Sequence, residues 1–177
     1  MMARLRRSLG ELLATFSAAD ASQPPVSGEP APDFELSDQH GRLRKLSEWR
    51  SQWLVLYFYP KDDTPGCTAE ACNFRDEWKQ IIALGAQVVG VSVDGSASHK
   101  KFAEKYHLPF TLLADVGGEV ARRYGALSDW KVFKFAKRYT FVINPQGRIA
   151  KSYLSVDAST HSAQVLADLR QLGAGGS

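Results

Sequence analysis

Apolar residues are grouped along this chain in two ways, as short continuous runs and as positions repeated at helical spacing. Residues 53–59 form an unbroken apolar run rich in aromatic and branched side chains, and residues 87–94 contain a second one. Such runs are typical of strands that are buried on both faces of a sheet. The remaining pattern predicts a helix at 98–106 capped by a serine, a strand at 111–115, a helix at 118–124, and a hairpin of strands 138–144 and 148–154 around the turn Asn-Pro-Gln-Gly.

A longer helix follows the first apolar run. Pro60 ends that run, and Thr64 with Pro65 predicts a helix start, with the threonine as N-cap and the proline at the first helical position. Cys72 falls on a polar face of this helix. The apolar stripe of the helix, at helical spacing, consists of Cys67, Ala71, Phe74, Trp78, Ile81 and Ile82.

The order of these elements predicts the fold class. An initial hairpin at residues 34–46 precedes strands and helices that alternate, and a closing helix presents Val165, Leu166, Leu169 and Leu172 on its apolar face. We therefore expect an α/β domain with a mixed central sheet, helices on both faces and an N-terminal hairpin extension.

Length and composition fit one folded domain at residues 28–177 behind a tail at residues 1–27. The chain has 177 residues, of which 44% are hydrophobic, enough for a full single-domain core. No apolar run approaches the roughly 18 to 20 residues that cross a bilayer, so no stable membrane insertion is expected. The net charge of +3 is mild, and a nucleic-acid partner would require a denser basic patch.

The tail combines a basic, amphipathic segment at residues 1–16 with a linker of small residues and proline at 17–27. Glu11 and the shortness of the apolar stretch weaken a secretory signal. A transit peptide for an organelle and a helix on a membrane surface stay open. We expect a cytoplasmic protein whose tail forms a loosely attached helix.

Cys67 is the first candidate for chemistry, because its predicted place is the first turn of a helix. Free backbone N–H groups and the positive end of the helix dipole favour a thiolate there, and a thiolate is nucleophilic. The alternative is a small buried apolar residue, which is the common role of an isolated cysteine.

Cys72 is the only other thiol in the chain. In an intact helix, two residues five positions apart have α-carbons roughly 8 to 9 Å apart, beyond the ~7 Å limit for a disulfide. A sulfenic acid at Cys67 could condense with Cys72 only if the helix start unwinds. A zinc site is disfavoured, because the pair has the wrong spacing and His40, His99 and His107 are scattered, as is His161.

The residues around Cys67 match a known family. The pattern Pro60-x-x-x-Thr64-x-x-Cys67 resembles the active-site motif of the peroxiredoxins. The longer stretch FYPKDDTPGCTAEAC, which ends at Cys72, resembles the subgroup called peroxiredoxin Q or bacterioferritin comigratory protein. The likeness extends from the opening GEPAPDF at 28–34 through RYTFVINPQG at 138–147 to the last helix.

This resemblance implies a thioredoxin-like fold and a peroxidase that reduces hydrogen peroxide or organic hydroperoxides without a cofactor or a metal. Cys67 would be the peroxidatic cysteine. Cys72 would be the resolving cysteine and would form an intramolecular disulfide with it, and thioredoxin or a similar dithiol would reduce that disulfide. Because both thiols lie in one chain, a monomer is expected.

The resemblance also implies roles for four neighbouring residues. Thr64 would orient the peroxide or the thiolate, and the backbone N–H groups of Gly66 and Cys67 would hold the peroxide oxygens. Pro60 would shield the thiolate from water and over-oxidation, and Arg138 would stabilise the thiolate and the transition state through its charge.

Each role has an alternative without catalysis. Thr64 could be only a helix cap and Pro60 only a strand terminator, while Arg138 belongs to a basic cluster that would suit a solvated loop. Glu70 is interpreted as a first-turn residue that favours the helix dipole, and it is not counted as catalytic. Residues 129–136, where aromatics alternate with lysines, are expected to form a loop beside the active site that could be an apolar rim for lipid hydroperoxides or for the reductant.

Two other functions use the same features. A thiol–disulfide exchanger would carry Cys-x-x-Cys, which this chain lacks. A non-enzymatic redox sensor or a chaperone-like binding module could use the Cys67–Cys72 pair to alter a surface.

Overall fold

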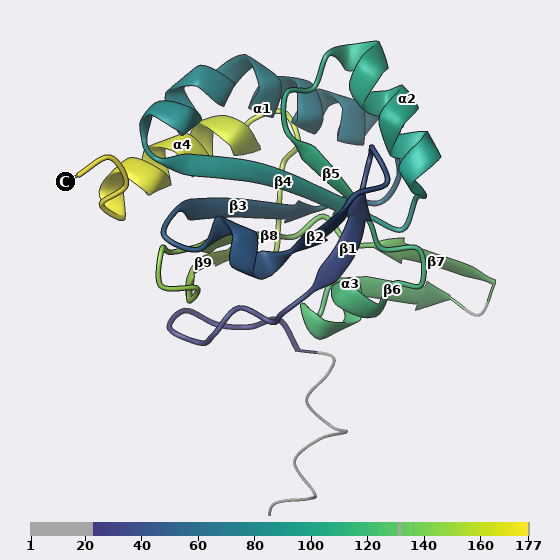
Figure 1. The fold of residues 1–177 in the computed structure, drawn as a ribbon, viewed down its shortest axis with the longest axis horizontal. Coiled ribbons are helices and arrows are strands. Elements are labelled where there is room, and N and C mark those ends of the chain that lie inside the picture. The colour runs from purple at the N-terminus through teal and green to yellow at the C-terminus, as the bar shows by residue number, and fades with distance from the viewer. Residues whose placement is uncertain (1–22, 131, 177) are drawn as a thin grey trace, which may run out of the picture.

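A mixed sheet forms the centre of the domain (Figure 1). The computed structural model describes residues 23–130 and 132–176. Within them the sheet has seven strands, in the spatial order β2-β1-β5-β4-β3-β8-β9. Their bounds are β1 (Glu35–Asp38), β2 (Leu43–Lys45), β3 (Trp53–Phe58), β4 (Ala86–Ser92), β5 (Thr111–Ala114), β8 (Thr140–Ile143) and β9 (Ile149–Tyr153).

Strands β3, β4 and β5 are parallel, whereas the other neighbours in the sheet pair antiparallel. The side chains of β3 alternate between two hydrophobic cores. Val55 and Tyr57 belong to one core, and Leu54, Leu56 and Phe58 belong to the other. Because both faces of β3 are covered, its sequence is apolar without interruption.

Helices cover both faces of this sheet, as the sequence predicts. Helices α1 (Pro65–Ala83), α2 (Ser96–Tyr106) and α4 (His161–Gln171) lie on one face, and α3 (Glu119–Arg123) lies on the other (Figure 1). The short 3-10 helix η2 (Leu46–Trp49) follows β2 and contributes Trp49 to the same core as α3. The layered α/β architecture that the sequence predicts is therefore confirmed.

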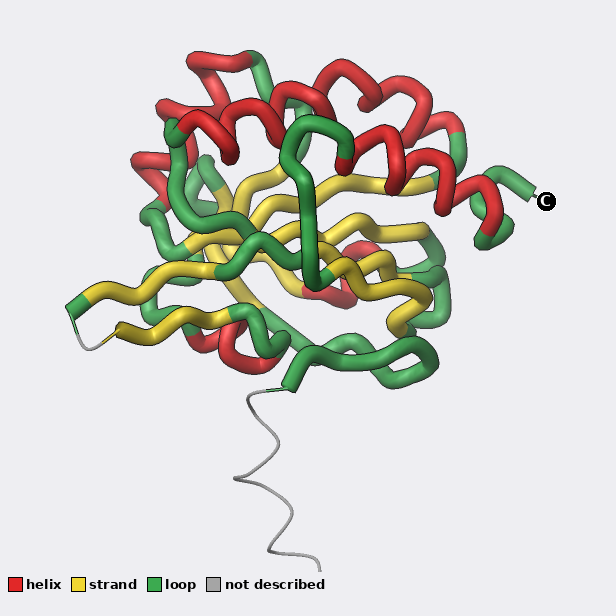
Figure 2. Tube along the Cα trace, turned by 180° about the vertical axis from the view of Figure 1, so that it is seen from behind, coloured by secondary structure: helices red, strands yellow, loops and turns green. Residues whose placement is uncertain are grey.

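Three details differ from the sequence predictions. Helix α2 begins at Ser96 behind Gly95 as N-cap, two residues before the predicted start. Strand β8 begins at Thr140, so that Arg138 lies in the connection before it. Residues 129–136, predicted to be a loop, contribute to a second sheet, the hairpin of β6 (Leu127–Trp130) and β7 (Phe133–Ala136), and this hairpin extends away from the body in Figure 2. Their alternation of aromatic and charged residues has the period of a strand.

The domain boundary at residue 28 stays a prediction, since residues 1–22 of the tail lie outside the described part. Residues 23–27 of the predicted linker contact the domain. The carbonyl oxygen of Pro25 accepts a hydrogen bond from Ser152 Oγ at 2.9 Å, and Ser27 Oγ donates to the carbonyl oxygen of Ala150 at 3.3 Å. This end of the linker therefore lies along β9.

Candidate active site

Cys67 lies where the chain leaves the centre of the sheet and enters α1. Strand β3 ends at Phe58, and α1 begins at Pro65 with Thr64 in the N-cap position, as predicted. Cys67 is the third helical residue and is 1% exposed. The N–H groups of the first turn have no partners within a helix, so those of Gly66 and Cys67 are available to an anionic group at the helix start.

Thr64 caps the helix through its backbone position and not through its side chain. Its carbonyl oxygen accepts a hydrogen bond from the N–H of Thr68 at 2.8 Å. Its hydroxyl does not cap the helix and instead donates to the carbonyl oxygen of Lys61 at 2.8 Å. The hydroxyl oxygen thus keeps acceptor capacity beside the helix start.

Arg138 reaches Cys67 from the connection before β8. Its Nη2 donates to Cys67 Sγ at 3.4 Å, and its Nη1 lies 3.6 Å from Glu70 Oε2. The pKa of Arg138 is raised: burial opposes its charge, but the negative charges of Glu70 and Cys67 favour it. A β-carbon on Gly66 would lie 3.0 Å from Arg138 Nη2, so the glycine leaves room for this approach.

Glu70 is a member of the site that the sequence interpretation missed. It is the sixth residue of α1 and not part of the first turn, and it is 1% exposed. Burial raises its pKa to about 7, although the charge of Arg138 acts in the opposite direction. The position of Glu70 in the sequence could have predicted its burial. Residue 70 lies three positions after Cys67 and one before Ala71, on the buried face of the helix.

Tyr57 completes a buried polar group under the helix start. Burial raises its pKa well above the ordinary value, and the negative charge of Glu70 is the next cause. Among the described residues, neither the Tyr57 hydroxyl nor either Glu70 oxygen has a hydrogen-bond partner. The charge of Arg138 therefore stabilises the ionised carboxyl group of Glu70. The same guanidinium donates a hydrogen bond to the sulfur of Cys67.

Helix α2 holds the loop that leads into α1. Asp62 Oδ2 lies 2.8 Å from His99 Nδ1, and Tyr59 Oη donates to Asp62 Oδ1 at 2.6 Å. Lys105 Nζ contacts Asp63 Oδ2 at 2.8 Å, and Asp63 has a positive φ of 58°. These contacts fix the backbone just before Thr64. Sequence spacing could not reveal the contacts of His99 and Lys105, because their partners lie more than thirty positions away.

Cys72 lies on the same helix as Cys67, is partly buried, and is a free thiol like Cys67. Both residues lie within the continuous helix α1. At five positions apart their α-carbons are about 8 to 9 Å apart, too far for a disulfide. The structure therefore brings together Cys67, Gly66, Thr64 and Arg138 and leaves Cys72 on a different face of the helix.

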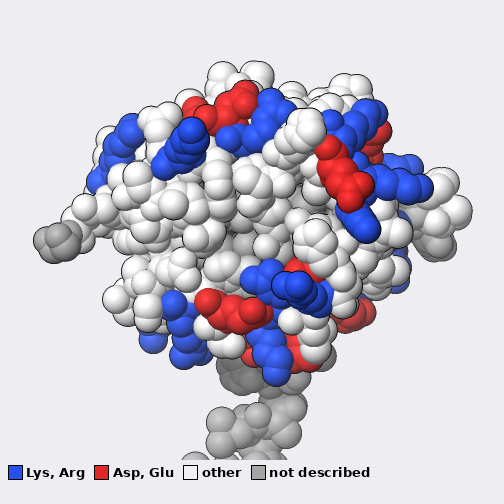
Figure 3. Space-filling view, turned by 45° about the horizontal axis from the view of Figure 1, so that its top comes forward, with Lys and Arg blue, Asp and Glu red and all other residues white. Residues whose placement is uncertain are grey.

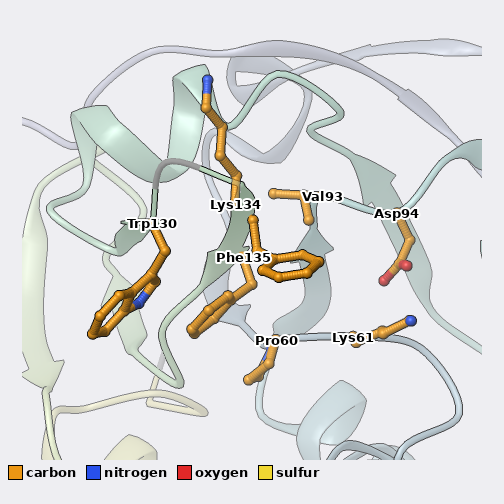
Figure 4. A pocket seen from close by; sticks show the side chains of 8 residues that line it. Pro60, Lys61, Val93, Asp94, Trp130, Lys134 and Phe135 are labelled. Atoms are coloured by element: carbon orange, nitrogen blue, oxygen red, sulfur yellow. The ribbon is translucent and has the colours of Figure 1, made fainter.

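Pro60 lies at one end of an apolar groove of about 790 Å³ between the active-site loop and the β6–β7 hairpin. Trp130 and Phe135 line it from the hairpin, and Figure 4 shows Lys134 extending away from it. Pro60 is thus the predicted site residue that faces this groove. The segment 129–136 does lie beside the active-site loop, although as a hairpin.

Three further features concern membranes, metal ions and nucleic acids as partners. None of the helices in the described residues is long and apolar enough to span a bilayer. The same residues contain no group of three or more His, Cys, Asp or Glu side chains arranged to hold a metal ion. On the face shown in Figure 3, basic side chains lie next to acidic ones and form no continuous basic surface.

Known proteins are similar to this chain in sequence. The model of the AhpC/TSA family matches residues 27–152. Peroxiredoxin Bcp of Bacillus subtilis is 43% identical over 152 residues, which cover 82% of this chain and 95% of that protein. Chloroplastic peroxiredoxin Q of Triticum aestivum is 46% identical over 127 residues, which cover 71% of this chain and 58% of that protein.

Solved structures of proteins of the same type are similar to this chain in fold. The crystal structure of peroxidoxin BcpB from Mycobacterium tuberculosis matches with a TM-score of 0.79 and 38% identity, and the match covers 83% of this chain and 97% of that one. A structure of Xanthomonas campestris peroxiredoxin Q matches with a TM-score of 0.74 and 32% identity over 78% and 90% of the two chains. The chain therefore belongs to the AhpC/TSA family and is a peroxiredoxin of the Bcp and peroxiredoxin Q type, a thiol peroxidase with a thioredoxin-like fold.

Proposed function

We propose that this peroxiredoxin reduces hydrogen peroxide and organic hydroperoxides at Cys67 and that Cys72 resolves the product as an intramolecular disulfide. The observation that carries the proposal is the approach of Arg138 Nη2 to Cys67 Sγ, at 3.4 Å, at the start of α1. A fixed positive charge and free N–H groups at one sulfur favour its thiolate.

In the first step the Cys67 thiolate attacks one peroxide oxygen. The S–O bond forms, the O–O bond breaks, and the electron pair moves to the leaving oxygen, which takes a proton and departs as water or alcohol. Sulfur is oxidised to a sulfenic acid. The guanidinium of Arg138 and the N–H groups of Gly66 and Cys67 stabilise the charge that moves across the oxygens. Thr64 orients the peroxide through its hydroxyl.

In the second step Cys72 attacks the Cys67 sulfenic sulfur, an S–S bond forms, and the oxygen leaves as water. The helix must open first, because an intact α1 keeps the two thiols apart. Residues 65–72 contain no large apolar side chain, so their release from the core exposes little apolar surface. Opening also returns the carboxyl group of Glu70 to water. The helix start is therefore suited to unwind while Phe74 holds the rest of α1 in the core.

In the third step an external dithiol reduces the disulfide by thiol–disulfide exchange, and we propose thioredoxin for this role. Pro60 shields the thiolate between cycles. We further propose that the enzyme acts as a monomer, since resolution needs no second subunit, and that it is cytoplasmic. Gel filtration tests the monomer, and localisation together with sequencing of the mature N-terminus tests the compartment.

Coupled turnover tests the cycle. Reduced protein is mixed with hydrogen peroxide, thioredoxin, thioredoxin reductase and NADPH, and NADPH loss is followed for the wild type and two variants. Cys67→Ser should abolish turnover, and Cys72→Ser should block thioredoxin-linked turnover while one thiol is still oxidised. Equal loss of the first oxidation in both variants would contradict the assigned roles. Reduction of protein disulfides without consumption of peroxide would instead indicate a thiol–disulfide exchanger.

A further inference from the structure

The tip of the β6–β7 hairpin exposes an unusual amount of apolar surface. Trp130, Val132 and Phe133 are 66%, 82% and 70% exposed, and they lie within four consecutive positions. Single exposed apolar residues are ordinary, but a cluster of this kind marks an interaction site. Figure 2 shows that the hairpin extends beyond the body of the domain, so the cluster lies on a protruding element.

The pairing of the two strands places the aromatic rings on one face. Trp130 is paired with Phe133 and Ser128 with Phe135, so these side chains lie on one face of the hairpin, and the paired Asp129 and Lys134 lie on the other. Trp130, Phe133 and Phe135 also line the groove that ends at Pro60, as Figure 4 shows for the residues that it labels. The apolar surface therefore continues from the hairpin tip toward the active-site loop.

Two exposed lysines flank this apolar surface. Lys61 lines the groove, whereas the Lys134 side chain extends away from it on the other face of the hairpin (Figure 4). Both lysines are exposed, and neither forms a salt bridge with another described residue. Neither of the two nearby carboxylates forms a salt bridge with these lysines. Asp129 lies 3.8 Å from Arg122, and Asp94 Oδ2 accepts a hydrogen bond from Ser92 Oγ. Because neither lysine has an ion-pair partner among the described residues, both can bind anionic groups outside the protein.

We propose that the tip of the β6–β7 hairpin docks on an anionic lipid bilayer, with Trp130, Val132 and Phe133 in the interface and Lys61 and Lys134 on the lipid headgroups. Tryptophan and other aromatics favour the boundary between headgroups and acyl chains. Basic side chains at the same level are attracted to anionic lipids. Such docking is peripheral and needs no spanning helix.

A second copy of this chain is a poorer occupant of the same surface. In an isologous contact the patch of one molecule faces the same patch of the other, so Lys61 and Lys134 would meet like charges across the interface. An anionic bilayer neutralises those charges. The docking proposal does not depend on the catalytic cycle, because binding to lipid is measured without turnover.

Vesicle sedimentation tests the proposal on the full chain. The probes are vesicles of phosphatidylglycerol and phosphatidylcholine in equal parts and vesicles of phosphatidylcholine alone. The wild type should bind the anionic vesicles more tightly and lose binding as salt is added. The double variant Trp130→Ser/Phe133→Ser should bind at least about tenfold more weakly, because each aromatic loses its burial in the interface.

The matched control is the double variant Val26→Ser/Leu43→Ser, which removes two other exposed apolar side chains. It should bind vesicles like the wild type. Lys134→Glu should weaken binding to anionic vesicles and leave binding to neutral ones unchanged. Circular dichroism and a single oxidation of Cys67 by hydrogen peroxide, which needs no reductant, confirm that each variant is folded, since none of these residues touches that substrate in the proposed cycle.

Three results would overturn the proposal. The first is a wild type that binds neither kind of vesicle. The second is a double variant of the hairpin that binds as well as the wild type, which would locate the lipid contact elsewhere in the chain. The third is a concentration-dependent dimer that the hairpin variant abolishes, without any vesicle binding, which would make a second copy the occupant of this surface.

Discussion

Replacing Glu70 by Gln should remove a pH dependence of stability that the buried carboxyl group imposes on the reduced protein. Glu70 is 1% exposed, and burial raises its pKa from 4.5 to about 7 in the folded state. On unfolding, the group returns to water and to its ordinary pKa. The folded state therefore binds the proton more tightly than the unfolded state does.

The difference between the two pKa values of Glu70 sets the direction and the size of the change in the free energy of unfolding with pH. Below pH 4.5 Glu70 is protonated in both states and has no effect. As the pH rises from 4.5 to about 7 the unfolded state loses the proton first, so the free energy of unfolding falls, and above pH 7 it levels off. At 1.36 kcal/mol for each pH unit between the two pKa values, the total fall is about 3 kcal/mol.

Urea unfolding of the reduced proteins at a series of pH values measures this effect. The comparison with Glu70→Gln is needed because His161, whose pKa burial lowers to about 4, makes stability rise over part of the same range. That contribution is common to both proteins and cancels in the difference. The free energy of unfolding of the variant relative to the wild type should rise by about 3 kcal/mol between pH 4.5 and pH 8.

Parallel curves for the two proteins, with a difference that changes by less than about 1 kcal/mol over this range, would refute the reasoning. Such a result would mean that Arg138 stabilises the ionised carboxylate enough to offset its burial. The same reasoning predicts slower disulfide formation in the variant above pH 7, because opening of the helix start would no longer release a buried charge.

Three further predictions concern the site and its support. Arg138→Met should slow peroxide oxidation of Cys67 by at least about 100-fold, measured by stopped flow, with partial recovery in Arg138→Lys. Cys72→Ser should accumulate a sulfenic acid that mass spectrometry detects as an added oxygen after one equivalent of peroxide, whereas a disulfide-linked product would speak against it. Gly90→Ala should destabilise the fold by about 1 to 3 kcal/mol in thermal unfolding, since the new β-carbon would lie 2.9 Å from the Tyr57 ring, and an unchanged midpoint would contradict this packing.

The sequence predicts those parts of the fold that local periodicity determines. The uninterrupted apolar run predicts β3, and Thr64-Pro65 predicts the start of α1 with Cys67 in its first turn. Neither prediction needs information from distant residues. The alternation of strands and helices predicts the layered α/β class, whereas the order of the strands in the sheet is seen only in the structure. The β6–β7 hairpin was missed because lysines between aromatics were interpreted by composition, although their period of two is that of a strand.

The electrostatics of the site depend on tertiary contacts that no local pattern encodes. Arg138 reaches Cys67 from 71 positions away, and its shared contact with Glu70 exists only because β8 lies beside β3. The placement of His99 against Asp62 likewise depends on how α2 packs against the active-site loop. The motif indicates which residues belong to the site, but the burial of Glu70 appears only in the folded structure.

The most direct test of the account is a single-turnover reaction of reduced protein with less than one equivalent of hydrogen peroxide, followed by stopped flow and by mass spectrometry of the products. Cys67 should be consumed orders of magnitude faster than a free thiol at the same pH, and each peroxide should yield one disulfide between Cys67 and Cys72. Oxidation at the rate of a free thiol, or a disulfide in which Cys67 takes no part, would contradict it.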